Sequence, residues 1–103
     1  PEIAIAGTAQ FDGDGLISAR LPFTTSGRAL TTGDPTGFVR ITADQRTDAI
    51  VGAQIVGPHA SELISEAVLA IEMAATPVDL WASIHPHPTL AEALADAAHR
   101  LTS

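Results

Sequence analysis

The chain contains no cysteine, no lysine and no tyrosine, and only one tryptophan. Without cysteine it has no disulfide, no cysteine-ligated zinc site and no thiol chemistry of its own. Its five basic residues, all arginines, are outnumbered by 12 acidic residues, so the net charge is −7. A nucleic-acid surface needs clustered positive charge, and we therefore expect no nucleic-acid partner.

Long apolar runs are also missing. None approaches the roughly 20 residues of a membrane span, and no secretory signal pattern is present. We therefore expect no membrane contact and a cytoplasmic location. A length of 103 residues with 46% hydrophobic residues indicates one folded domain, residues 1–103. Because the chain begins at Pro1 without a methionine, we expect a domain that comes from a longer protein.

The first half of the chain has the pattern of β-strands. Four short, largely apolar segments are candidates: 1–6, 16–23, 37–43 and 49–56. The side chains expected to share a face within each strand are Ile3 and Ile5; Ile17, Ala19, Leu21 and Phe23; Val39 and Ile41; and Val51, Ala53 and Ile55. A short polar turn at 44–48 predicts an antiparallel hairpin between the last two strands. The glycine-rich stretches 7–15 and 24–37 are expected to be irregular.

The second half changes to helical periodicity. Residues 59–75 form an amphipathic pattern, with Glu62, Glu66 and Glu72 expected toward solvent. A short helix follows to about Ser83, with Thr76 as N-cap and Pro77 at its first position, and a last helix reaches about Leu101. Strands followed by helices predict an α+β fold, an antiparallel sheet of four to five strands with C-terminal helices packed on it.

Three large apolar residues lie outside the helix faces that are predicted to be buried: Leu69, Met73 and Trp81. Scattered exposed apolar residues are normal on a protein surface. The alternative is a surface that a partner covers, and the sequence leaves both interpretations open.

The segment 85–92, with the sequence HPHPTLAE, concentrates the polar chemistry. Its prolines fix φ and remove two N–H donors, so a stiff, extended segment is expected before the last helix. Thr89 and Glu92 have the S/T-x-x-E spacing of a capping box. Glu92 would then stand in the first turn of the helix, where it can hold the ring of His87 by one nitrogen.

Three interpretations of this segment compete. In the first, Thr89 and Glu92 only cap the helix. In the second, the H-x-H pair binds a metal, as in the first motif of the cupins. In that motif a strand runs through the glutamate, whereas Glu92 is expected to open a helix. The motif also has a glycine before the first histidine, and this chain has Asp79 in that place. His59 and His99 have no reason to converge on the pair, so we expect no metal.

In the third interpretation, His87 and Glu92 are an acid–base pair. Imidazole exchanges protons near neutral pH, and a carboxylate on one ring nitrogen fixes the tautomer and stabilises the imidazolium. The pair has no nucleophile of its own in this chain. It would therefore act on a group supplied from outside.

The motif H-x-H-P-T-L-x-E resembles the C-terminal signature of the flavoprotein disulfide reductases, the pyridine nucleotide-disulfide oxidoreductase family. Other segments resemble the same family in the same order: 1–4, 22–23, 27–29, 37–40, 52–58 and 60–64. Leu90 and the additional His85 favour the dihydrolipoamide dehydrogenase branch over the glutathione reductase branch, which usually reads His-Pro-Thr-Ser. Mercuric reductases usually lack this histidine.

The resemblance implies a C-terminal dimerisation domain. In a homodimer, His87 would reach the flavin and redox-active disulfide of the other subunit and accept a proton from a lipoyl-bearing substrate. Glu92 would orient His87, while His85 has no catalytic role in the family pattern. The backbone of His87 and Pro88 would lie near the partner's flavin. FAD and NAD are expected in the parent enzyme, and neither cofactor nor activity in the chain alone.

One segment departs from the family. The resemblance implies a short helix after the first strand, but residues 8–15 are too few for it. An alternative of another class is a free-standing homodimeric interaction module with the same fold and no catalytic role. A G-x-G-x-x-G turn and a C-x₄-C motif upstream would distinguish the enzyme from this module.

Overall fold

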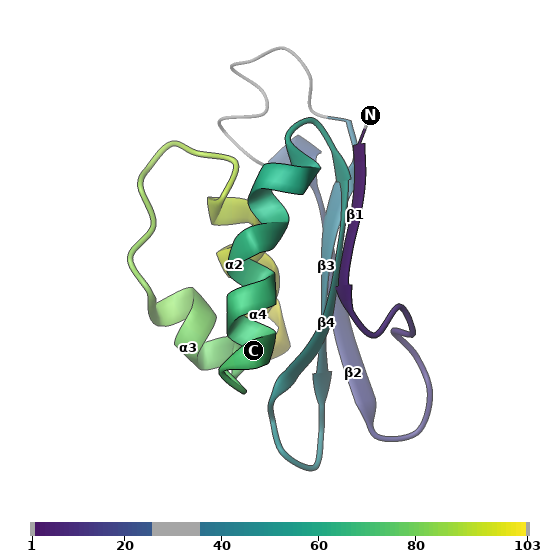
Figure 1. Ribbon diagram of the computed structural model, residues 1–103. Coiled ribbons are helices and arrows are strands. Elements are labelled where there is room, and N and C mark those ends of the chain that lie inside the picture. The colour runs from purple at the N-terminus through teal and green to yellow at the C-terminus, as the bar shows by residue number, and fades with distance from the viewer. Residues whose placement is uncertain (1, 26–35, 103) are drawn as a thin grey trace.

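A four-stranded antiparallel sheet forms one layer of the molecule and helices form the other (Figure 1). The computed structural model describes residues 2–25 and 36–102. These residues form the strands β1 (Glu2–Gly7), β2 (Leu16–Pro22), β3 (Phe38–Asp44) and β4 (Ile50–Gly57), a 3-10 turn η1 (Phe23–Thr25), and the helices α2 (Ala60–Glu72), α3 (Pro77–Ala82) and α4 (Glu92–Thr102). The strand order is β1-β4-β3-β2. The predicted α+β class is confirmed, while the resemblance at 27–29 and most of the stretch 24–37 lie outside the described residues.

The sheet buries one face under the helices. Helix α2 packs on β1 and β4, α4 packs on β2 and β3, and α3 packs on α4. The centre of the core comprises the inward side chains of the two middle strands and the small side chains of α2 and α4: Val39, Ile41, Ala53, Ile55, Ala67, Ala97 and Ala98, each at most 1% exposed. Alanine on the helix faces lets the helices approach the sheet closely, and larger strand residues fill the space.

Strand β1 turns its smaller side chains toward the core and its larger ones away from it. Ile3 and Ile5 share a face as predicted, but that face points away from the helices, and they are 71% and 55% exposed. Ala4 and Ala6 pair with Ile55 and Ala53 of β4 and therefore point into the core. The pairing register with β4 decides the orientation of this strand.

A bulge in the β3–β4 hairpin changes which residues of β4 are buried, so the prediction that Val51 shares the buried face of Ala53 and Ile55 is wrong. The register shifts between Thr42 and Ala43, so that Thr42 lies opposite Gly52 while Ala43 lies opposite Ile50. Val51 is left without a partner in β3 and is only partly buried, whereas Ile50 is 1% exposed. The backbone N–H of Ile50 donates to the carbonyl of Ala75 at 2.8 Å, which joins the bulge to the connection between α2 and α3.

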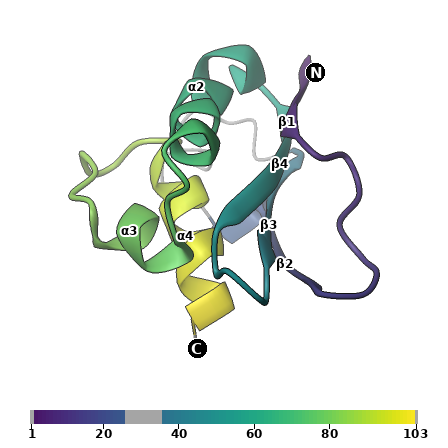
Figure 2. The ribbon, with the colours of Figure 1, turned by 60° about the horizontal axis from the view of Figure 1, so that its bottom comes forward.

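The loop after β1 folds back over the outer face of the sheet, opposite the helices (Figure 2). The side-chain amide of Gln54 donates to the carbonyls of Thr8 and Ala9, each at 3.3 Å. The guanidinium of Arg40 lies 3.7 Å from the centre of the Phe11 ring. Residues 8–15 thus remain irregular, as predicted, and cover part of the sheet.

Helix α2 follows a residue with left-handed backbone conformation, and its first turn is hydrogen-bonded to strand β1. His59 precedes the helix with φ 64° and makes no side-chain cap. Instead, Oε1 of Glu2 accepts hydrogen bonds from the backbone N–H and the hydroxyl of Ser61, at 3.0 and 2.6 Å. These two bonds hold the pKa of Glu2 below its usual value. A carboxylate here also complements the positive end of the helix dipole.

Candidate functional site

The segment between α3 and α4 carries the polar motif. Helix α3 begins with the predicted cap: the Thr76 hydroxyl accepts from the backbone N–H of Asp79 at 3.2 Å, and the Asp79 carboxylate accepts from the N–H of Thr76 at 2.9 Å. The chain leaves α3 in an extended conformation at Ser83. It then runs without regular secondary structure through two prolines, with a cis peptide between His87 and Pro88.

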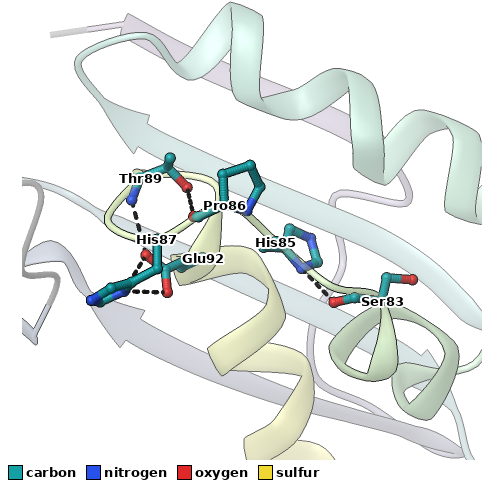
Figure 3. Close-up of polar contacts among 6 residues, drawn as sticks. All are labelled: Ser83, His85, Pro86, His87, Thr89 and Glu92. Atoms are coloured by element: carbon teal, nitrogen blue, oxygen red, sulfur yellow. Dashed lines mark hydrogen bonds and ion pairs between the residues drawn. The ribbon is translucent and has the colours of Figure 1, made fainter.

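His87 and Glu92 are in contact (Figure 3). Nδ1 of His87 lies 3.0 Å from Oε1 and 2.9 Å from Oε2 of Glu92. An ionised carboxylate only accepts hydrogen bonds, so Nδ1 is the donor, and in the neutral ring the lone pair is then on Nε2. The His87 side chain is 79% exposed, and no residue of 2–25 or 36–102 hydrogen-bonds to Nε2. The arrangement is that of a base whose accepting atom faces outward.

Glu92 is fixed from a second side. Its Oε1 accepts from the backbone N–H of Thr89 at 2.9 Å, which is one half of the predicted capping box. The other half, a bond from the Glu92 N–H to the Thr89 hydroxyl, is not found among the described residues, and that hydroxyl donates to the carbonyl of Pro86 at 2.7 Å. The Thr89 N–H, and then the His87 ring, hold the pKa of Glu92 below its usual value.

This lowered pKa predicts a dependence on acid. Glu92 has an ordinary value of 4.5 and a lower one in the fold, so its ionisation stabilises the fold above pH 4.5. That contribution is lost as the pH falls through the lower folded value. In an NMR titration, we expect the amide shift of Thr89 to change below pH 4.5 and the change to vanish in the Glu92→Gln variant. A titration of that amide unaffected by Glu92→Gln would contradict the assignment.

His85 binds a different partner from His87. Its Nε2 lies 2.6 Å from Oε2 of Glu66 on α2, and its Nδ1 lies 2.8 Å from the carbonyl of Ser83. The sequence did not predict this pair. Glu66 was expected toward solvent, but its side chain is only 34% exposed and contacts His85. The two residues are 19 positions apart, and nothing in the helical pattern of α2 distinguishes Glu66 from Glu62.

The four histidines do not converge. His85 and His87 bind separate carboxylates, His59 precedes α2, and the ring of His99 lies 4.5 Å from that of Trp81. Within the part of the chain that the structure describes, no three histidine, aspartate or glutamate side chains are placed to share a metal ion. The geometry of the H-x-H pair is therefore that of two independent contacts.

A shallow groove lies between α2 and α3. It has a volume of about 220 Å³ and is lined by Glu66, Leu69, Ala70, Met73, Ala75, Asp79, Leu80 and Ser83. Leu69 and Met73 are 63% and 72% exposed, as their positions in the sequence predicted. The volume is below the roughly 300–1,000 Å³ of typical small-molecule sites. Trp81, 41% exposed, packs on His99 and does not line the groove.

None of the helices within residues 2–25 and 36–102 combines the length and the apolar character that crossing a membrane requires.

Comparison with known proteins identifies the family of the chain. Residues 1–98 match the family model "Pyridine nucleotide-disulphide oxidoreductase, dimerisation domain". The chain is 50% identical over 102 residues to a dihydrolipoyl dehydrogenase of Haloferax volcanii and 44% identical to one of Bacillus subtilis, with 95% of this chain and 22% of each relative covered. The chain thus spans about a fifth of the length of these relatives.

A solved structure extends the agreement to the fold. LpdA from Mycobacterium tuberculosis superposes with a TM-score of 0.92 at 32% identity, covering 100% of this chain and 23% of that one. The flavoprotein disulfide reductase RclA from Escherichia coli, at 22% identity and a TM-score of 0.85, shares the fold. The chain therefore belongs to the pyridine nucleotide-disulphide oxidoreductase family, as its dimerisation domain.

Proposed function

We propose that this dimerisation domain supplies His87 and Glu92 as an acid–base pair to the active site of a partner subunit in a dihydrolipoamide dehydrogenase-like flavoenzyme. The observation that carries the proposal is the hydrogen bond from His87 Nδ1 to Glu92, which leaves Nε2 exposed. The similarity to proteins named dihydrolipoyl dehydrogenase supports the class of substrate, a lipoyl-bearing dithiol.

In this proposal, Nε2 of His87 accepts the proton of a substrate thiol. The thiolate that results is the nucleophile in thiol–disulfide exchange, since the thiol itself reacts poorly. Glu92 stabilises the imidazolium and keeps the ring oriented. General acid–base assistance of this kind contributes about 10²- to 10⁴-fold in rate.

The chain contains no cysteine, so the redox-active disulfide belongs to another segment. FAD and NAD in the parent would carry the electrons from the reduced disulfide. His87 and Pro88 are exposed residues, and their backbone is the part of this chain that would approach the flavin of the partner. The cytoplasmic location expected from the sequence is part of the same proposal.

The proposal requires a homodimer, because His87 of one subunit acts in the active site of the other. The exposed residues Leu69 and Met73 rim the groove between α2 and α3, and the groove is continuous with Glu66, which binds His85 two residues from His87. We therefore assign this groove to contact with a second copy of the chain. Burying exposed apolar side chains of this size would favour association.

Subunit complementation tests the shared site. A subunit carrying His87→Ala and a subunit whose redox disulfide is removed should each be inactive as homodimers. A mixed dimer contains one site with both an intact disulfide and an intact His87, and it should recover up to about half of the wild-type turnover. If the mixture stays inactive while mixed dimers are detected by mass, the contribution across the subunit interface is wrong.

The second candidate is the interaction module without chemistry. The exposed groove favours it, because the groove needs no histidine to serve as a contact surface. The sequence upstream of this domain discriminates between the two. The absence there of both G-x-G-x-x-G and C-x₄-C would favour the module.

A further inference from the structure

We propose that the His85–Glu66 pair is a positioning device for His87, and this inference rests on the function proposed above. His85 is assigned no role in the family pattern. In the structure its side chain is only 10% exposed and both ring nitrogens are engaged, by Oε2 of Glu66 at 2.6 Å and by the Ser83 carbonyl at 2.8 Å. Two contacts on opposite sides of a planar ring fix its orientation.

The pair joins helix α2 to the connection between α3 and α4. Glu66 lies on α2, whereas His85 belongs to the connection between α3 and α4. Ile84, the apolar neighbour of His85, is 99% exposed and provides no packing anchor. Among the hydrogen bonds of residues 2–25 and 36–102, the one between His85 and Glu66 is the bond that joins this segment to α2.

The rest of the segment transmits that position to His87 through short links (Figure 3). Pro86 has a restricted φ, and its carbonyl accepts from the Thr89 hydroxyl at 2.7 Å. The Thr89 N–H donates to Glu92, which in turn holds the His87 ring. His87 thus lies between an anchor on α2 and an anchor on α4.

We expect the distance from α2 to His85 to matter more for this role than the charge of Glu66. Aspartate keeps the charge but shortens the side chain by one methylene, about 1.5 Å. In the wild type the Glu66 carboxylate and the Ser83 carbonyl both accept from the His85 ring. Glutamine keeps the length of the side chain, and its amide can either accept from an N–H at Nε2 or donate to an Nε2 that carries no hydrogen. A displacement of about 1 Å at a reacting group can cost up to 10²-fold in rate.

The test compares Glu66→Asp with Glu66→Gln in the intact enzyme. We expect Glu66→Asp to lower kcat for dihydrolipoamide about tenfold with little change in KM, because chemistry rather than binding is affected. Glu66→Gln should restore most of that loss. Glu62→Asp and Glu62→Gln, on the exposed surface one turn earlier in α2, control for the helix propensity of each substitution.

Hydrogen exchange gives a readout that does not depend on turnover. Backbone amides of 84–92 should exchange faster in Glu66→Asp than in Glu66→Gln or the Glu62 variants. Equal kcat and equal exchange for Glu66→Asp and wild type would overturn the positioning role, and so would a larger loss in Glu66→Gln than in Glu66→Asp. If His87→Ala itself has no effect on turnover, the acid–base proposal fails, and the exchange result still decides whether the pair fixes the segment.

Discussion

Replacing His87 with alanine in the intact enzyme should lower dihydrolipoamide turnover by about 10²- to 10⁴-fold while FAD stays bound. The side chain is 79% exposed, and Glu92 contacts only its ring. Its removal therefore takes away the proton acceptor without opening a cavity in the core. Steady-state assays would measure the loss, and the flavin absorbance of the purified variant would report the bound cofactor.

Two controls make this result specific. His99→Ala removes another exposed imidazole on the same domain, one that contacts Trp81 and not Glu92, and should retain turnover. Oxidation of NADH by an artificial dye moves no substrate thiol proton, so His87→Ala should leave that reaction largely intact. A loss of less than about tenfold in lipoamide turnover would remove His87 from the catalytic assignment.

Replacing Met73 with glutamate should dissociate the proposed dimer. Met73 is 72% exposed in the isolated domain and lies on the rim of the groove assigned to the second copy. An unpaired charge buried in an interface costs about 2–5 kcal/mol, or roughly 30- to 5,000-fold in dissociation constant. A twofold axis places the substitution in the interface twice, so the effect should lie toward the upper end.

Sedimentation or light scattering across a dilution series would measure the dissociation. Ile3→Glu is the matched control, because Ile3 is 71% exposed but lies on the opposite face of the sheet. Dissociation should also remove lipoamide turnover, since His87 would no longer reach a partner. A Met73→Glu protein that remains a dimer at low concentration would show that the groove is not the contact surface.

Features set by neighbours in sequence were predictable. The Thr76 cap involves residues within one helical turn, and His87 and Glu92 are five positions apart at a helix start. The alternation of Val39 and Ile41 likewise identifies the buried face of a strand. In each case the chain itself fixes the distance, so residue order contains the information.

Features set by tertiary contact were not predictable. Glu66 resembles any solvent-facing glutamate of an amphipathic helix until the segment after α3 brings His85 against it. The bulge that exposes Val51 and buries Ile50 depends on pairing with β3. The capping-box pattern predicts that the Thr89 hydroxyl bonds to the backbone N–H of Glu92. In the fold, the hydroxyl instead donates to the carbonyl of Pro86 at 2.7 Å.

The strand order also bears on how the chain folds. The β3–β4 hairpin is local, whereas β1 pairs Ala4 with Ile55, across about half of the chain. Because closing a long loop costs more entropy than closing a short one, the first strand is expected to dock after the hairpin has formed. Destabilising substitutions at Ala4 should then accelerate unfolding in stopped-flow experiments and leave the refolding rate nearly constant, and until β1 docks the edge of β4 stays open to intermolecular pairing.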